Sequence, residues 1–171
     1  MCYADFFMHV SRIFLGLGEE SFAQLLRSIS IGKLKTFQLY ERVKTRLHVQ
    51  KLNSEALRKV APRSWARLSE PDSEDFATEL SQAILISHLD LIKAVLDHLG
   101  IPHEDGFFAK DVDSSKYLVD GWQQSTYEKF KGVYPESLLL FYINHLGSEL
   151  VKSIELFSPT SSAPHSPLSP A

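Results

Sequence analysis

Apolar side chains recur three or four positions apart along most of this chain, which is the spacing of a helix that buries one face. The clearest run has its apolar positions at Ile92, Val95, Leu96 and Leu99. Ser87 and Asp90 precede this run with the spacing of a capping box at a helix start. Gly100 can adopt the left-handed conformation that ends a helix, and Pro102 prevents continuation. The pattern predicts a helix that ends just before Gly100.

The same spacing predicts further helices, separated by glycine, proline and serine positions. In the first half of the chain they cover residues 5–15, 20–29 and 33–48, and a segment that begins at residue 53 or 54 and that Pro62 stops or restarts. In the second half they comprise a segment from residue 72 that leads into the helix above, a helix that begins at Ser114, residues 138–146, which Gly147 ends, and residues 148–157. Residues 103–106 read as a turn. We therefore predict an all-α fold, a compact bundle of about seven to eight helices with orthogonal or irregular packing and no sheet beyond a stray pair of residues.

The helical pattern also predicts which side chains form the hydrophobic core, because the apolar positions of each helix face inward. The predicted core residues are Phe22, Leu26, Phe37, Val43, Leu47, Trp65, Phe76, Leu80, Ile92, Val95, Leu99, Trp122 and Leu139.

Charge divides the chain near the turn at residues 69–73. Residues 1–68 hold 12 lysines and arginines against 5 aspartates and glutamates, a net charge of +7. Residues 69–171 hold 6 lysines and no arginine against 16 acidic residues, a net charge of −10. We interpret residues 1–68 as a basic helical subdomain and residues 69–157 as an acidic helical subdomain packed on it. The tail, residues 158–171, is rich in serine and proline and has no charged residue, so we expect it to be disordered.

The basic residues are the main candidates for a binding surface, because 11 lysines and arginines fall within residues 27–67. Their partner is expected to be a protein with acidic residues, or the acidic half of the same chain. The alternative is nucleic acid, since a short helix, a glycine-containing turn and a longer basic helix are the ingredients of helix-turn-helix recognition. The candidate residues are Lys33, Lys35, Arg42, Lys44, Arg46, Arg58, Lys59 and Arg63.

A metal-dependent enzyme is a weaker alternative, because six potential ligands fall close together in the sequence. They are His98, His103, Glu104, Asp105, Asp111 and Asp113. Imidazole and carboxylate groups suit zinc, iron or manganese, but the helical part offers no histidine pair four residues apart. Cys2 is the only cysteine, so neither an intrachain disulfide nor a cysteine zinc site can form. We predict no catalytic residue, metal or cofactor.

The N-terminal residues are apolar, but Asp5, His9 and Arg12 interrupt them, unlike the uniform core of a signal peptide. No stretch has the 18 or so apolar residues that a membrane-spanning helix needs. We therefore expect a cytoplasmic protein without a membrane partner. The sequence as a whole favours a non-enzymatic helical module that binds a protein or has a regulatory role.

Overall fold

The computed structural model of the chain describes residues 9–29, 54–150 and 155–160. Within these residues the fold is mostly helical, as predicted, with seven α-helices and one short 3-10 helix. The helices are α1 (Val10–Leu17), α2 (Glu19–Arg27), α5 (Ser54–Leu68), α6 (Glu74–Ser87), α7 (Leu89–Leu99), η1 (Ser114–Lys116), α8 (Trp122–Phe130) and α9 (Glu136–Leu150). Two strands of two residues each, β1 (His103–Glu104) and β2 (Phe107–Phe108), form a small antiparallel hairpin.

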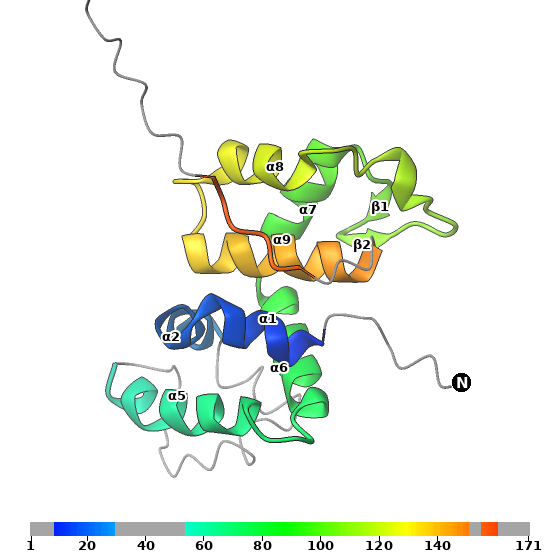
Figure 1. Cartoon of the computed structure of the whole chain (residues 1–171). Helices are drawn as coiled ribbons and strands as arrows, with labels where there is room; N and C mark the ends of the chain where they lie inside the picture. Colours follow the sequence, from blue (N-terminus) through cyan, green and yellow to red (C-terminus); the bar gives the residue numbers. More distant parts are fainter. Residues whose placement is uncertain (1–8, 30–53, 151–154, 161–171) are drawn as a thin grey trace, which may run out of the picture.

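The helices form two groups that α6 connects (Figure 1). In one group α1 and α2 pack on each other and α2 packs on α5. In the other group α8 packs on α7 and α9, and the hairpin lies near α7 and α9. Contacts of α1 with α6 and α9, and of α2 with α9, join the two groups. These contacts cross the predicted boundary between residues 68 and 69, and the division into two subdomains stays a prediction.

A single hydrophobic core runs through both groups. At its centre Phe14 of α1 stacks on Phe141 of α9, with ring centroids 5.0 Å apart, and meets the ring of Phe22 edge-on at 5.5 Å. The predicted core residues that are buried are Phe22, Leu26, Phe76, Leu80, Ile92, Val95, Trp122 and Leu139. Trp65 and Leu99 are only partly buried against this core. Phe37, Val43 and Leu47 lie outside the described residues.

The end of α7 is as predicted, but its start is not. Gly100 has φ 72°, and the Ile101 amide donates to the Leu96 carbonyl at 2.9 Å, which satisfies a carbonyl at the helix end. The predicted capping box is wrong, because the Ser87 hydroxyl donates back to the Ala83 carbonyl of α6. His88 separates the two helices instead, with φ −132° and ψ 44°.

Three other helix boundaries differ from the prediction. Pro62 lies inside α5 and neither stops nor restarts it. The helix expected from Ser114 is only the short η1, and α8 begins at Trp122 after Gly121. Helix α9 continues through Gly147 to Leu150, and Gly147 faces Trp122 and Gln123 of α8. The prediction of a separate helix over residues 148–157 is therefore wrong: residues 148–150 belong to α9, and residues 155–157 are not helical.

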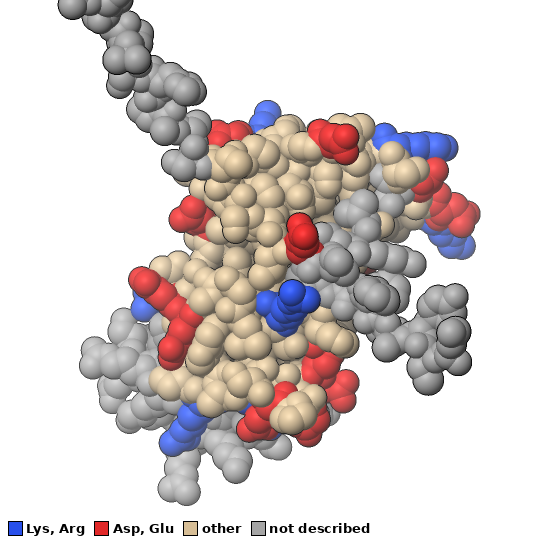
Figure 2. All heavy atoms as spheres, in the orientation of Figure 1, with Lys and Arg blue, Asp and Glu red and all other residues tan. Residues whose placement is uncertain are grey.

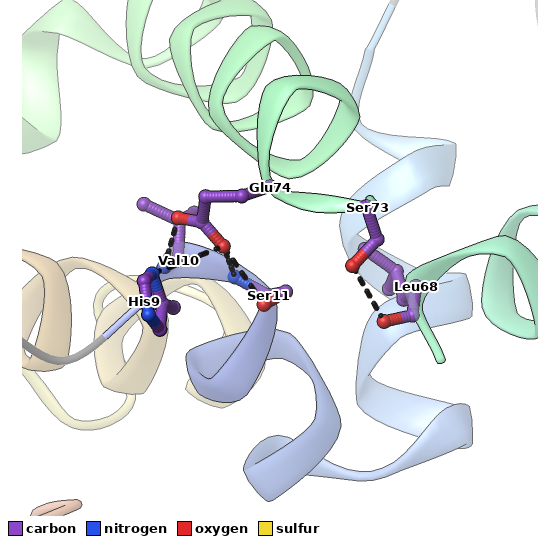
Figure 3. Close-up of polar contacts among 6 residues, drawn as sticks. All are labelled: His9, Val10, Ser11, Leu68, Ser73 and Glu74. Atoms are coloured by element: carbon purple, nitrogen blue, oxygen red, sulfur yellow. Dashed lines mark hydrogen bonds and ion pairs between the residues drawn. The ribbon is translucent and has the colours of Figure 1, made fainter. Parts of the chain in front are cut away.

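The start of α1 is held by a residue that is distant in sequence (Figure 3). The Glu74 carboxylate, at the beginning of α6, accepts hydrogen bonds from the Val10 amide at 2.7 Å and from the Ser11 amide at 3.2 Å. The Ser11 hydroxyl donates to the same carboxylate at 2.8 Å. Nearby, the Ser73 hydroxyl donates to the Leu68 carbonyl at 2.9 Å and closes the turn between α5 and α6.

The described part of the C-terminal segment lies against α8 and α9. The Phe157 amide donates to the Asn144 side chain at 2.7 Å, and the Thr160 amide donates to the Gln124 side chain at 3.1 Å. The predicted disordered tail begins at Ser158, and its residues 161–171 lie outside the described part. No helix among the described residues is both long and apolar enough to span a membrane.

Candidate binding groove

An open hollow of about 420 Å³ lies between α6, α7, the hairpin and α9, and we call it the α6–α9 groove. It lies within the size range of ligand-binding pockets. Most of its lining is apolar, with a few polar side chains. The lining residues are Val10, Thr78, Ser81, Gln82, Leu85, Ile86, Leu89, Ile92, Gly106, Phe107, Phe108, Tyr142, His145 and Glu149.

The hairpin forms one wall of this groove because of its turn. Asp105 has φ 51° and Gly106 has φ 92°, the two positive values that a two-residue type I′ hairpin turn requires. The Gly106 amide donates to His103 Nδ1 at 3.1 Å, and His103 Nε2 is 2.8 Å from the Asp97 carboxylate of α7. Lys93 of α7 also pairs with Asp105 at 3.0 Å. These contacts fix the hairpin on α7.

The rim of the groove exposes two large apolar side chains. Phe107 of β2 is 63% exposed and Ile86 of α6 is 37% exposed. Successive residues of a strand point to opposite faces, so Phe108 packs on the core while Phe107 points outward. An aromatic side chain exposed beside an apolar hollow is typical of a site that another molecule covers.

Helix α9 contributes the polar side chains of the groove. Tyr142, His145 and Glu149 are spaced three and four residues apart, so they share one face of the helix. Tyr142 is only 4% exposed, whereas the His145 side chain is 16% exposed and that of Glu149 is 52% exposed. His145 Nδ1 and the Glu149 carboxylate are 3.8 Å apart, too far for a hydrogen bond.

Burial shifts the pKa values of all three side chains. It lowers the pKa of His145 to about 4, so the imidazole is neutral at physiological pH and its contact with Glu149 is not an ion pair. Burial also raises the pKa of Glu149, and the pKa of Tyr142 is raised by burial and, secondarily, by the charge of Glu149. A weakly basic histidine is a poor general base near neutral pH, so this arrangement suits binding better than proton transfer.

Few of the basic residues that we predicted to form a binding surface have a side chain that the structure describes. Lys33, Lys35, Arg42, Lys44 and Arg46 lie outside the described residues. Arg58 and Lys59 lie within α5, where only the course of the backbone is described, and Arg63 of the same helix is exposed. On the face that Figure 2 shows, the described lysines and arginines stand apart from one another and do not form a continuous patch.

The structure does not bring the predicted metal ligands together. His98 lies edge-on to the Phe130 ring at 5.6 Å, whereas His103 contacts Asp97 and Asp113 accepts hydrogen bonds from Ser115. No group of three or more histidine, cysteine, aspartate or glutamate side chains within the described part of the chain is close enough to hold a metal ion. The contacts of these residues are those of a hairpin and its flanking turns.

A second hollow, of about 390 Å³, lies between α2, His88 and the start of α9. Arg27 and Tyr134 line it, together with His88, whose Nε2 atom has no hydrogen-bond partner. That nitrogen has almost no accessible surface, so a ligand in the hollow does not reach it. Burial lowers the pKa of His88, and the charge of Asp90 has a smaller effect in the opposite direction. This hollow is therefore a weaker candidate for a binding site than the α6–α9 groove.

The α6–α9 groove was not predicted from the sequence. Two signals of it were present: the Asp105-Gly106 pair, which favours a two-residue hairpin turn, and the spacing of Tyr142, His145 and Glu149 along one face of α9. No protein-family model, no curated protein and no solved structure matches this chain.

Proposed function

We propose that this protein is a non-enzymatic helical module whose α6–α9 groove binds an apolar segment of another protein. The observation that carries this proposal is the exposed Phe107 at the rim of an apolar hollow, with Ile86 beside the same hollow. Aromatic residues are enriched in the energetic centres of protein interfaces, and helices on either side of a groove are a common setting for an apolar peptide.

Covering these side chains supplies the favourable free energy of association. Burial of apolar surface contributes about 25 cal/mol per Å², so a partner that covers Phe107 and fills the hollow gains several kcal/mol before the entropic costs of binding. The neutral His145 in the lining of the groove is compatible with an apolar ligand, because a neutral imidazole costs less to desolvate than a charged one.

Site-specific photo-crosslinking in the native host tests the proposal. A photoreactive amino acid replaces Phe107 in one variant and Val133 in the control, since Val133 is also exposed, at 68%, but does not line the groove. We expect a light-dependent adduct with another protein at position 107, absent at position 133 and lost when Ile86→Asp is added. Identical adducts at both positions, or a small molecule that co-purifies in native mass spectrometry and blocks cross-linking, would contradict it.

A further inference from the structure

Two polar side chains of the α6–α9 groove have hydrogen-bonding capacity that the described protein does not use. Tyr142 lines the groove and is 4% exposed, yet its hydroxyl forms no hydrogen bond within the described part of the chain. By contrast, Ser81 in the same lining donates its hydroxyl to the Thr78 carbonyl at 2.7 Å. The Tyr142 oxygen is not one of the fully buried atoms that lack a partner, so it is accessible and can hydrogen-bond water or a polar group of a ligand in the groove.

The described lining of the groove carries a negative charge. Among these residues Glu149 is the only acidic one, and none is a lysine or an arginine. The nearest titratable neighbours of Glu149 on α9 are Tyr142 and His145, both uncharged at neutral pH, and the groove-lining residues of α6 are uncharged. A carboxylate in this position has lost part of its hydration, and no lysine or arginine among the described residues of the lining compensates for that loss.

We infer that the segment bound in the α6–α9 groove carries a lysine or arginine beside its apolar anchors, which pairs with Glu149, and a polar group that hydrogen-bonds the Tyr142 hydroxyl. This inference rests on the proposed function and specifies the chemistry of the partner. An acidic segment is disfavoured, because it would place like charges next to each other in a poorly solvated groove. A purely apolar segment would leave both polar groups without partners.

Selection from a displayed library of random peptides tests the inference on the full chain. The library is selected on the wild-type protein, on Glu149→Gln, on Phe107→Asp and on Val133→Asp, each first shown by circular dichroism to be folded. We expect the wild type and Val133→Asp to enrich peptides that combine large apolar residues with lysine or arginine. Glu149→Gln should enrich the apolar residues alone, and Phe107→Asp should enrich neither.

The affinity of one enriched peptide gives the quantitative check. We expect it to bind Glu149→Gln about 2- to 5-fold more weakly than the wild type at low salt, with a smaller difference at high salt, because the carboxylate is half exposed. Tyr142→Phe should weaken binding about 2- to 10-fold without changing the preference for basic residues. If basic residues are enriched equally on Glu149→Gln, or on no variant, the inference fails while the proposed function stands. If Phe107→Asp enriches the same peptides as the wild type, both fail.

Discussion

Glu74 begins α6, yet its carboxylate satisfies backbone amides at the start of α1. Helix α1 has only eight residues and no side-chain cap of its own, so these bonds and its packing hold it in place. We predict that Glu74→Ala lowers the free energy of unfolding by about 1–3 kcal/mol, since it leaves partly buried amides without an acceptor.

Asp75→Ala is the matched control for this prediction. Asp75 carries the same charge in the same first turn of α6, but it is exposed and forms none of the bonds to α1. Its loss removes only a favourable interaction with the helix dipole, worth about 0.3–1 kcal/mol. Urea unfolding of both variants measures the difference, and equal losses would show that the bonds to α1 contribute nothing.

Protonation of His145 makes the free energy of unfolding depend on pH. Its pKa is about 4 in the folded protein, below the ordinary value of 6.5, so the unfolded chain takes up a proton first as the pH falls. The stabilisation from the neutral imidazole is therefore complete above pH 6.5 and is lost progressively toward pH 4. We predict a loss of about 2 kcal/mol from this residue between pH 7 and pH 5.

Two other titratable groups modify this pH dependence. His88 also has a lowered pKa and adds to the loss, whereas the raised pKa of Glu149 opposes it at the acidic end. Comparison with His145→Asn isolates the contribution of His145. Urea unfolding at pH 7 and at pH 5 should show a smaller loss in the variant, and parallel losses in both proteins would contradict the assignment.

At the scale of the helices, we expect alanine substitution to change the stability in opposite directions at two glycines that lie inside helices. A Cβ atom at Gly147 of α9 would lie 3.5 Å from the Trp122 ring and 3.3 Å from the end of the Gln123 side chain, which can move. A Cβ atom at Gly16 of α1 would overlap the Leu156 side chain. Alanine is favoured over glycine within a helix by about 1 kcal/mol, so the space around each glycine decides the sign.

We therefore predict that Gly147→Ala raises the melting temperature and that Gly16→Ala lowers it. The gain at Gly147 should be at most about 1 kcal/mol. Removing the obstructing side chain, in the double variant Gly16→Ala with Leu156→Ala, should restore part of the stability that Gly16→Ala loses relative to Leu156→Ala alone. The same sign for both glycine variants in a thermal melt would contradict this account of their packing.

The helices themselves follow from local patterns, whereas the groove does not. The end of α7 depends on Gly100 and the residues beside it, so the sequence predicts it correctly. Helix α9 runs through Gly147, which lies against Trp122, 25 positions earlier in the chain, and α5 contains Pro62 without a break. The groove requires Phe107, Ile86 and His145 to meet from three elements, and no local spacing encodes that meeting.

At the scale of the whole molecule, the uneven distribution of charge along the chain bears on whether the protein binds nucleic acid. The basic segment of residues 27–67 could neutralise phosphates, but the net charge of the chain is −3 and its acidic half would repel a polyanion. The described basic side chains on the face in Figure 2 form no continuous patch. We predict that at about 150 mM salt the full chain does not bind duplex or single-stranded nucleic acid with a Kd tighter than about 10 μM.

A salt titration of the full chain checks this prediction, together with two charge-reversed variants. One variant changes Lys35, Arg42 and Arg46 to Glu, and the other changes Lys59 and Arg63 to Glu. We expect the same weak signal from all three proteins at 150 mM salt. A log–log slope of about −2 to −3 for the wild type, reduced in either variant, would instead identify direct phosphate contacts, because each neutralised phosphate releases counterions. Nucleic acid would then bind the basic segment of residues 27–67, and the α6–α9 groove would bind a different partner.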